Sequence, residues 1–341
     1  MKRLLISMLL LVALFPAVTN AQKKQKMFGV AFYNLENLFD TIANNQYGRD
    51  LEYTPTGDNK WDSRKYWAKI KNLSYSISQL KTKYTPDGPA VIGCSEIENR
   101  GVLEDLVKAE AIKDWNLQIV HHDSPDRRGI DVGLLYNPKY FKVINVTNHR
   151  LDIGYPTRDQ MCVVGLLGGS RTAIIVNHWP SRRGGSEASS PSREKAAALT
   201  RHICDSLYKI DPKMGVIIMG DLNDDPSNKS VAEVIGAVKN PKDCREGGYY
   251  NPFWKKLDDG IGSYMYNHGW DLFDQIIINY NLLEGVGGLK YYDAKVWNSD
   301  FLLQKTGQYK GYPLRTFSSG VWTNGYSDHL PTEIFLLKEL N

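Results

Sequence analysis

The sequence lacks the features that mark several specialised classes of protein. Four cysteines in 341 residues are too few for a disulfide-stabilised scaffold, and their positions match no zinc-binding spacing. Internal repeats, heptad series and low-complexity tracts are absent as well. With 42% hydrophobic and 23% charged residues, the composition is that of a globular protein.

A strong excess of charge of either sign is also missing. Residues 1–21 carry two of the 42 basic residues and no acidic one, which leaves 40 basic against 38 acidic side chains in the rest of the chain. Binding to nucleic acid would therefore have to rely on local basic patches and metal ions, because the bulk charge is too small.

Long apolar runs are missing except near the N-terminus. Two basic residues precede an apolar run over 4–15, and Pro16 ends it before small and polar residues up to Ala21. This is the order of a secretory signal peptide, and the run is too short for a membrane-spanning helix. We therefore predict a signal peptide over residues 1–21, export to the periplasm or the medium, and no membrane span. No cysteine lies near the predicted cleavage site, which argues against a lipid anchor.

The four cysteines differ in their surroundings. Cys94 and Cys162 lie in apolar strand-like runs, and we predict that they are small core residues. Export would permit a disulfide, for which Cys204 and Cys244 are the candidate pair.

Strand-like and helix-like segments alternate over residues 22–341 without a boundary-like linker, which predicts one α/β domain. We expect helices at 63–80, 102–112, 192–208 and 231–238. Strands are expected at 28–33, 90–92, 117–120, 130–136, 141–146, 161–167, 172–176, 214–219, 275–278 and 333–337.

The segment Met219–Pro226 combines a strand end with a polar turn. Gly220 allows the backbone to turn without a Cβ. Asp221 and Asn223 are two residues apart, so on a chain that is still extended both would point to the same face. Their oxygens would suit a hard metal ion, a water molecule or a phosphate group. An ordinary Asx-rich turn would explain the same residues, so this segment alone decides nothing.

Other strands end in polar residues in the same way. Any one of them has a structural explanation, since Asn can cap a turn, Glu is usually solvated and a lone His is usually structural. Their repetition at strand ends favours a shared site. The residues concerned are Asn34, Glu96, His178, Asp274 and the pair Asp328 and His329. An adjacent Asp and His favour catalysis, because an imidazole can take a proton near neutral pH.

Two further acids and three arginines need comment. Glu98 is expected to be an ordinary solvated loop residue, whereas Asp131 lies inside an apolar strand and needs a partner. Arg127 and Arg128 could bind phosphate, because a guanidinium group matches phosphate oxygens, but a solvated basic turn is an equal alternative. Arg182, in the loop after His178, is a third candidate for substrate binding.

Aromatic residues are frequent over 243–270. Beside a cleft they could stack on bases or sugars. They could equally wedge a loop against the sheet, which we expect for most of them.

The ordered set of strand-end residues resembles the endonuclease/exonuclease/phosphatase superfamily, which includes deoxyribonuclease I-like enzymes, abasic-site endonucleases and neutral sphingomyelinases. The resemblance rests on an N-terminal Asn, a strand-end Glu, an N-H motif, G-D-L-N, a late Asp and a C-terminal S-D-H, and it covers Asn34 to His329. It is nearest to secreted bacterial members that carry F-Y-N-L-E-N-L-F-D. It implies a four-layered α/β sandwich, in which two packed sheets are flanked by helices and the site lies at one edge.

The resemblance also implies a role for each residue. Glu96 matches the metal-binding Glu, and Asn34 and Asp328 would help to position the metal. His329 matches the general base, which Asp274 would orient, and His178 would stabilise the transition state. Asp221 and Asn223 would position the attacking water and the phosphate. Whether His329 or Asp221 takes the proton stays open.

A divalent metal fits this chemistry, because hydrolysis of a phosphodiester needs an activated water and neutralised phosphate charge. Oxygen ligands without thiolates favour Mg²⁺, with Mn²⁺ and Ca²⁺ as alternatives, over zinc. We therefore expect an exported, monomeric, metal-dependent phosphodiesterase, foremost an endonuclease acting on DNA, with RNA as an alternative substrate.

Two alternatives remain. A sphingomyelinase-like or small phosphate-ester hydrolase would keep the chemistry and would use a phospholipid or small ester as substrate. It would need an exposed apolar hairpin, for which residues 285–326 offer Trp297, Phe301, Leu302, Leu303, Phe317 and Trp322. Lysines in the same stretch suit a polyanion. A non-catalytic binding protein of this fold should have lost a motif residue, and none is lost.

Overall fold

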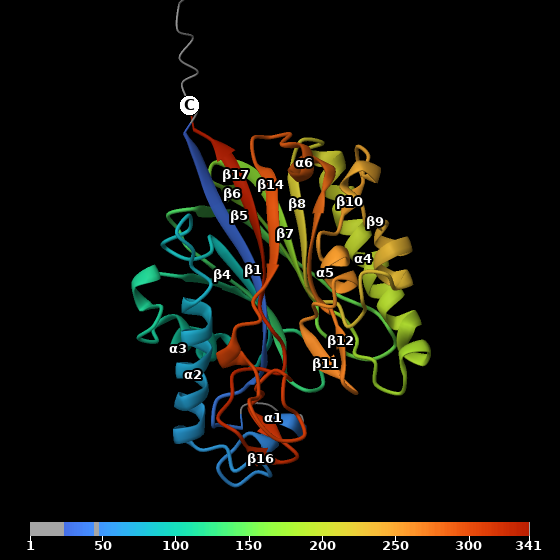
Figure 1. Cartoon of the computed structure of the whole chain (residues 1–341). Coiled ribbons are helices and arrows are strands. Elements are labelled where there is room, and N and C mark those ends of the chain that lie inside the picture. Colours follow the sequence, from blue (N-terminus) through green and yellow to red (C-terminus); the bar gives the residue numbers. More distant parts are fainter. Residues whose placement is uncertain (1–23, 44–47, 341) are drawn as a thin grey trace, which may run out of the picture.

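The computed structural model describes residues 24–43 and 48–340 (Figure 1). Two large sheets pack face to face in it, and helices cover the outer face of each, so the predicted four-layered α/β sandwich is confirmed. The predicted signal peptide, residues 1–21, lies outside the described residues. Within them, no helix is long and apolar enough to cross a membrane.

The first sheet joins the two ends of the described chain. Its first strand, β1 (Gln25–Leu38), pairs antiparallel with the last strand, β17 (Thr332–Glu339), and parallel with β2 (Val91–Ile97). The strand order is β14-β17-β1-β2-β4-β3. The remaining members are β3 (Gln118–His121), β4 (Asp131–Tyr136) and β14 (Lys290–Val296).

The second sheet has the order β5-β6-β7-β8-β13-β10-β9. Its centre is formed by β7 (Ser170–His178), β8 (Gly215–Asp221) and β13 (Asp274–Asn279), with β7 parallel and β13 antiparallel to β8. The outer strands are β5 (Phe141–His149), β6 (Gln160–Leu167), β9 (Ala237–Val238) and β10 (Tyr249–Tyr250).

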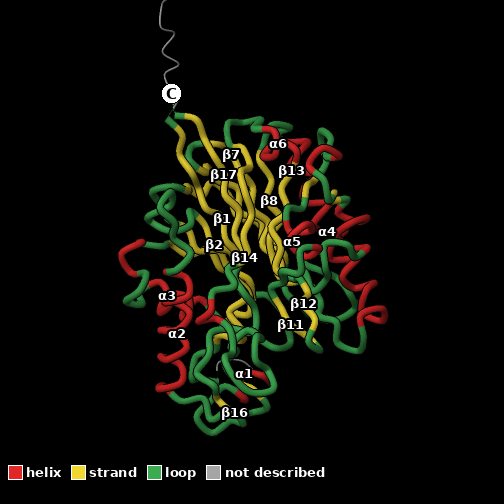
Figure 2. The backbone as a smooth tube through the Cα atoms, in the orientation of Figure 1, coloured by secondary structure: helices red, strands yellow, loops and turns green. Residues whose placement is uncertain are grey.

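Two small hairpins lie beyond the sheets, at the end of the molecule opposite the C-terminus (Figures 1 and 2). They are β11 (Tyr264–Tyr266) with β12 (Gly269–Asp271), and β15 (Phe317–Ser318) with β16 (Val321–Trp322).

Alternation along the strands divides the interior into three apolar layers. In β1, Val30 and Phe32 pack between the two sheets, whereas Ala31 and Tyr33 face the helices outside the first sheet. The layer under the second sheet packs against a long helix in the same way. Because successive side chains of a strand point to opposite faces, each β-branched run supplies two layers at once.

The helices are α1 (Gly48–Glu52), α2 (Ser63–Ser78), α3 (Arg100–Val107), α4 (Ser186–Ile210), α5 (Phe253–Asp258) and α6 (Tyr280–Glu284). Shorter turns are η1 (Lys113–Trp115), η2 (Ser230–Ile235), η3 (Pro241–Asp243) and η4 (Asp300–Leu302). The predicted helix over 63–80 is found almost unchanged, and its start is capped by Asp62, whose side chain accepts from the Lys65 N–H.

The helix expected from residue 192 begins six residues earlier, before Pro191. The completely buried Arg193 explains this extension, because its guanidinium donates to the Ser186 carbonyl and the Ser189 hydroxyl and pairs with Asp224. The helix expected over 231–238 is a π-helical turn, η2, that gives way to the short strand β9.

All four cysteines are buried, as predicted for Cys94 and Cys162, and all four are free thiols. The candidate disulfide between Cys204 and Cys244 is therefore absent. These two side chains belong to different apolar layers, one under α4 and the other between the sheets.

Candidate active site

The strand-end residues of both sheets meet in one cavity of about 640 Å³, which we call the central cleft. The side chains lining it include Glu96, His178, Asp221, Asn223, Asp328 and His329. Glu96 comes from the first sheet, and His178 and Asp221 come from the second. The predicted convergence at one edge of the sandwich is thus present in the structure.

Strand register places three of these residues in one row. His178 at the end of β7 is paired with Asp221 at the end of β8, and Asp221 is paired with Asp274 at the start of β13. Asn34 of β1 reaches across from the other sheet, and its side-chain amide donates to Asp221 Oδ2 at 3.0 Å. Its oxygen accepts from the Glu36 N–H at 2.9 Å, so Asn34 acts on the cleft through Asp221. The predicted metal-ligand role of Asn34 stays a prediction.

The turn after β8 differs from the one expected. Gly220 lies inside the strand, where a Cβ would come within 2.2 Å of the Asn177 carbonyl oxygen, so this glycine permits a close approach of two backbones. The chain is no longer extended at Asn223, whose φ is 50°. The Asn223 N–H donates to Asp221 Oδ1 at 3.0 Å, which forms an Asx turn. This turn, and not the alternation of side chains along an extended strand, brings both residues to the cleft.

His329 and Asp274 form a tight pair. Nδ1 of His329 lies 2.6 Å from Asp274 Oδ2, which also accepts from the Ser263 hydroxyl at 2.6 Å. Nε2 of His329 faces Asp221 Oδ2 at 3.8 Å. Burial disfavours the imidazolium, but the Asp274 and Asp221 carboxylates outweigh it and raise the pKa of His329 well above its usual range. The ring is oriented by one carboxylate and directed towards the other.

His178 has the opposite electrostatic character. Burial, followed by the nearby Arg158 and Arg128, lowers its pKa well below the usual range, so the ring is neutral. Nε2 lies 3.6 Å from Asp221 Oδ2 and 3.9 Å from Glu96 Oε1. The surroundings of the two histidines therefore shift their pKa values in opposite directions.

The acids of the cleft repel one another. Burial, together with the charges of Asp274 and Glu96, raises the pKa of Asp221 to about 7, although His329 opposes the shift. Burial and the charge of Glu36 raise the pKa of Asp328 to about 6. A divalent cation would relieve this crowding, so the residues present fit a metal ion of the hard, oxygen-binding class.

Glu96 is held in an unusual backbone conformation, with φ at 59°. Its Oε2 accepts from the Asn37 N–H at 2.9 Å, and its Oε1 faces Arg128 at 3.7 Å. Glu98, expected to be solvated, is in fact buried, and its carboxylate accepts from the Asp40 N–H at 2.8 Å. This expectation failed because the loop folds back over β1, which a local pattern does not show.

The three predicted arginines are divided between two environments. Arg128 lines the central cleft and also a larger cavity of about 1040 Å³, the arginine hollow, which Arg127, Arg158 and Arg183 line as well. Arg182 lines the central cleft, but its guanidinium contacts Asp225 at 3.0 Å and Asp271 at 3.5 Å. The charge of Arg182 is thus neutralised by acids of the protein itself, and its guanidinium stacks over the Phe273 ring.

Several contributors carried no clear sequence signal. Buried Arg158 donates to the His178 and Trp179 carbonyls and pairs with Asp126, which fixes the loop after β7. Arg315 donates to Asp328 Oδ2 at 3.0 Å and contacts Glu36, a buried acid. Ser327, by contrast, is part of the S-D-H motif, and its hydroxyl donates to the Asn34 carbonyl oxygen at 2.7 Å. No local pattern in the sequence indicates Arg158 or Arg315.

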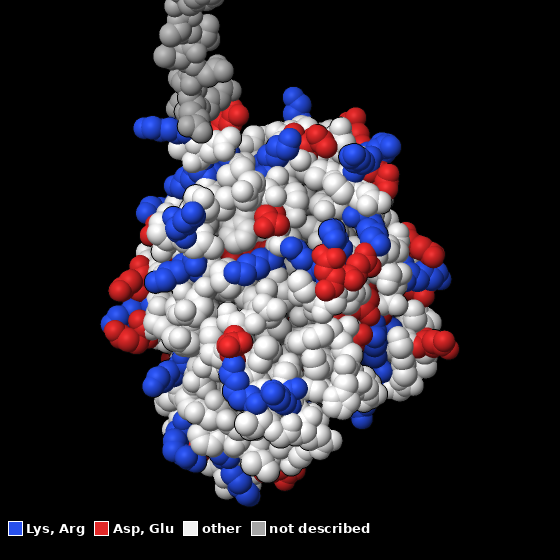
Figure 3. All heavy atoms as spheres, in the orientation of Figure 1, with Lys and Arg blue, Asp and Glu red and all other residues white. Residues whose placement is uncertain are grey.

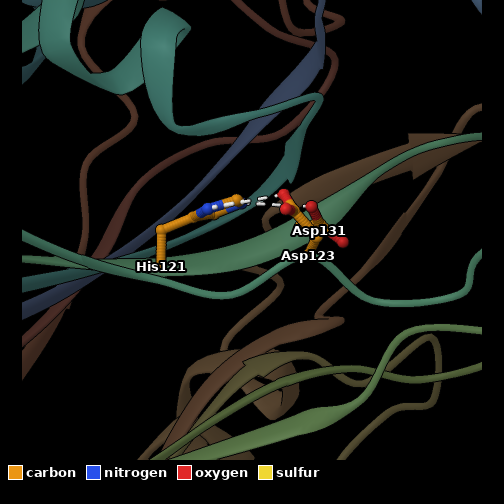
Figure 4. A group of neighbouring side chains, drawn as sticks. All are labelled: His121, Asp123 and Asp131. Carbon is orange, nitrogen blue, oxygen red and sulfur yellow. Dashed lines mark hydrogen bonds and ion pairs between the residues drawn. The ribbon is translucent and has the colours of Figure 1, made fainter. Parts of the chain in front are cut away.

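A second histidine–acid cluster lies between β3 and β4 (Figure 4). Nε2 of His121 lies 3.1 Å from Asp131 Oδ2, and its Nδ1 lies 3.8 Å from Asp123 Oδ1. The other oxygen of Asp131 accepts from the backbone N–H and the hydroxyl of Ser124. These contacts supply the partner that Asp131 needs. The ring uses a different nitrogen for each acid, so the cluster is a hydrogen-bonded brace for the loop.

Comparison with solved structures returns proteins of the same fold. A humanized D. rerio TDP2 is 14% identical, covering 91% of this chain and 98% of that one, with a TM-score of 0.56. D. rerio TDP2 complexed with single strand DNA product is 13% identical, with the same coverage and TM-score. An endonuclease/exonuclease/phosphatase family protein from Bacteroides thetaiotaomicron is 15% identical, covering 93% and 97%, with a TM-score of 0.54.

Curated protein sequences provide no match. The model of one protein family, described as Endonuclease/Exonuclease/phosphatase family, matches residues 29–338. That match spans both sheets and every predicted site residue, from Asn34 to His329. The chain therefore belongs to the endonuclease/exonuclease/phosphatase family.

Proposed function

We propose that the protein is an exported phosphodiesterase that depends on a divalent metal and cleaves nucleic acid, with DNA as the principal substrate. The observation that carries the proposal is the central cleft, where His329, Asp221 and neutral His178 face one space and buried Asp274 holds the His329 ring in place. Family membership supports metal-dependent hydrolysis of phosphoesters in general. The substrate and the roles of single residues are the finer steps that we add.

The arginine hollow favours a polyanionic substrate. It opens into the central cleft, with which it shares Arg128 and Arg183. Arg158 is neutralised by Asp126 at 2.8 Å, but Arg127 and Arg183 make no hydrogen bond or ion pair with any described residue. Two uncommitted guanidinium groups beside the cleft would bind phosphates next to the one that reacts.

Basic and acidic side chains are mixed over the face shown in Figure 3, with broad areas of neither. Attraction of nucleic acid would therefore come from the hollow, as the near-balance of charge in the sequence requires. In one fold neighbour, the TDP2 of D. rerio, the structure contains single strand DNA product. That observation supports nucleic acid as the class of ligand for this chain.

The residues of the cleft divide the catalytic work. Asp274 fixes the tautomer and direction of His329, because its carboxylate engages Nδ1 and leaves Nε2 facing the cleft. Two candidate acceptors for a proton from the attacking water lie 3.8 Å apart, Oδ2 of Asp221 and Nε2 of His329. His329 can serve only after it gives up the proton that its raised pKa favours. Neutral His178 can donate from Nε2 to a phosphate oxygen as negative charge develops there.

A bound divalent ion would supply Lewis-acid polarisation of the phosphate and a more acidic water. Glu96 and Asp328 would hold it, and Asn34 would steady the arrangement through Asp221. Arg315, which donates to Asp328, keeps that carboxylate directed into the cleft. We expect Mg²⁺ as the physiological ion, with Mn²⁺ or Ca²⁺ as alternatives.

The phospholipid alternative loses its main support. The apolar side chains that would have formed a membrane hairpin are turned inward, with Trp297 and Leu302 buried. Phe301 packs on Tyr326 and Tyr75, and Phe317 packs on Trp61. Among the described large apolar and aromatic side chains of residues 285–326, Tyr292 and Val321 are exposed, so only a small apolar surface is available to a lipid.

A substrate panel tests the function. Purified protein that begins at residue 22 is incubated with plasmid, single-stranded DNA, RNA, sphingomyelin and small phosphate esters, each with Mg²⁺, Mn²⁺ or EDTA. We expect cleavage of nucleic acid with either metal and none in EDTA. Rapid hydrolysis of sphingomyelin or a small ester, with intact nucleic acid, would replace the proposal by the alternative.

Export and oligomeric state need separate measurements. Mass spectrometry of the protein from its native host should find an N-terminus close to residue 22, and intact Met1 in the cytoplasmic fraction would contradict export. Size-exclusion chromatography with light scattering should give the mass of a monomer.

A further inference from the structure

A cavity of about 410 Å³, which we call the tyrosine groove, adjoins the central cleft and shares no lining residue with the arginine hollow. It is defined by Tyr264, Tyr266, His268, Tyr309, Tyr312 and Arg315. Tyr264, Tyr266 and Asp328 line both the groove and the central cleft, so a ligand can extend from one into the other. The catalytic scheme above uses Asp328 and Arg315 at the edge of this groove and gives no role to its aromatic rings.

The charge of the groove suits an uncharged ligand group. Arg315 is the only Lys or Arg among the described residues that line it. Its guanidinium is matched by two carboxylates, Asp328 at 3.0 Å and Glu36 at 3.3 Å. No positive charge is left for a second phosphate, in contrast to the arginine hollow with its uncommitted Arg127 and Arg183. A planar, neutral ring fits the lining better.

The rings are held in place before any ligand binds. Asn267 and His268 both have positive φ, at 46° and 63°, which is the conformation of a tight two-residue hairpin turn between β11 and β12. The His268 N–H donates to the Tyr312 hydroxyl at 2.8 Å, and the two rings meet edge to face at 5.5 Å. Tyr312 in turn packs against Tyr309 at 5.3 Å.

Tyr266 presents the accessible ring surface. It is 63% exposed, although most large apolar and aromatic side chains in the described part of the chain are buried. By contrast, its neighbour Tyr264 is stacked on Phe273 at 5.3 Å and packed against His329 at 4.9 Å. Tyr264, which packs against His329, and exposed Tyr266 both belong to β11 and line both cavities, so the groove adjoins the central cleft along this strand.

Carboxamides complete the lining. Asn267, Gln304 and Gln308 border the groove, and each carries both hydrogen-bond donors and an acceptor. Such groups can match the edge of a nucleobase without requiring one particular base.

We propose that the tyrosine groove binds an unpaired nucleobase adjacent to the phosphate in the central cleft, so that the protein prefers single-stranded nucleic acid or unpaired ends to intact duplex. This inference rests on the proposed function and names the form of its substrate. A base inside a duplex has both faces stacked and its pairing edge occupied, so it cannot enter a groove lined by rings and amides. An unpaired base can stack on Tyr266 at no such cost.

The test measures binding, without turnover. Fluorescence anisotropy in EDTA compares three labelled probes of equal length: a single strand, the same strand with abasic residues, and the duplex. We expect the wild-type protein to bind the single strand about tenfold more tightly than the abasic strand, as one stacked base provides. Tyr266→Ala should remove most of that preference, and Tyr266→Trp should restore it. Tyr292→Ala, at a 59% exposed tyrosine of β14 outside the groove, is the matched control and should bind like wild type.

Two results would overturn the inference. One is equal affinity of the wild-type protein for the abasic and the normal single strand, and the other is an unchanged preference in Tyr266→Ala. The proposed function would survive either result if metal-dependent cleavage of nucleic acid is observed in the substrate panel. Absence of any such cleavage would instead refute the function, whatever the binding measurements give.

Discussion

Two clusters in this molecule have the same composition, one histidine and two aspartates, and very different surroundings. Asp221, Asp274 and His329 are completely or almost completely buried and come from two strands and a distant loop. His121, Asp123 and Asp131 lie within eleven residues of one another, and the Asp123 side chain is 86% exposed. Residue types and short distances are therefore not enough to define a reactive centre.

Convergence is what separates the two clusters. Around His329, neutral His178 and the carboxylate of Glu96 arrive from other strands and share one cavity. In the second cluster, the carboxylate of Asp131 accepts hydrogen bonds from the backbone N–H and the hydroxyl of Ser124. None of the three residues of this cluster lines the central cleft. In the first cluster, buried carboxylates lie close together and repel one another, which shifts their pKa values. In the second cluster, the histidine and the acids are paired with each other or with Ser124.

The largest difference should appear in turnover. His329→Ala and Asp274→Ala should each lower kcat by about 10²–10⁴, because a positioned general base or its orienting partner is lost. The double variant should be little worse than the worse single variant, since the two act as a unit. His121→Ala is the matched control and should keep kcat. Near wild-type turnover of His329→Ala would contradict the mechanism.

His178→Ala sharpens the same contrast within the cleft. It removes a donor to the phosphate and leaves the proton-transfer pair intact, so its loss should multiply with that of His329. Steady-state kinetics of the two single variants and the double variant measure this, and a double variant no worse than His329→Ala would place both histidines in one step.

Metal binding should separate the clusters next. Glu96→Gln should weaken the tight Mn²⁺ site by more than about tenfold in calorimetric titration, while the circular dichroism spectrum stays native. Asp123→Asn should leave the titration unchanged, because the second cluster needs no ion. Loss of the tight site in Asp123→Asn would show that the brace is a metal centre after all.

A mutation in the second cluster should affect the free energy of unfolding and leave turnover nearly unchanged. Asp131→Asn disrupts the bonds to Ser124 and His121, and we expect it to cost about 1–3 kcal/mol in urea unfolding. Its kcat should stay within a few-fold of wild type once folded protein is counted. A loss of kcat as large as that of His329→Ala would join the brace to the active site.

Glu333 is a buried acid that belongs to neither cluster, and replacing it should have the smallest effect, a change in the pH dependence of stability. Trp297 donates to its Oε2, but Oε1 has no partner among the described residues, and burial raises its pKa well above the usual range. The folded state therefore keeps a proton that the unfolded state releases above about pH 4.3. The free energy of unfolding falls as the pH rises from that value towards the raised pKa of folded Glu333. Glu333→Gln should match wild type near pH 4 and be more stable at pH 8, by on the order of 1 kcal/mol. An equal difference at both pH values would rule out the titration.

Prediction from sequence succeeded where the signal is local. Strand-end positions such as Glu96, His178 and Asp221 follow from apolar runs that stop at a polar residue. The partners of those residues depend on contacts across the chain, such as Ser263 with Asp274 or Arg315 with Asp328. Left-handed backbone at Glu96 and Asn223 is set by the same packing. No periodicity encodes either property, and for the same reason the local pattern at Glu98 predicts a solvated residue although its carboxylate is buried against the Asp40 N–H.

The pairing of β1 with β17 has a consequence for how the protein is made. A ribosome releases Asn34 long before His329, and the Ser327–Asn34 bond cannot form until both are present. The nascent chain therefore lacks a complete candidate site while residues 35–326 are being made. A nuclease of the kind proposed above would stay inactive towards the nucleic acids around the ribosome until residues 327–329 have emerged.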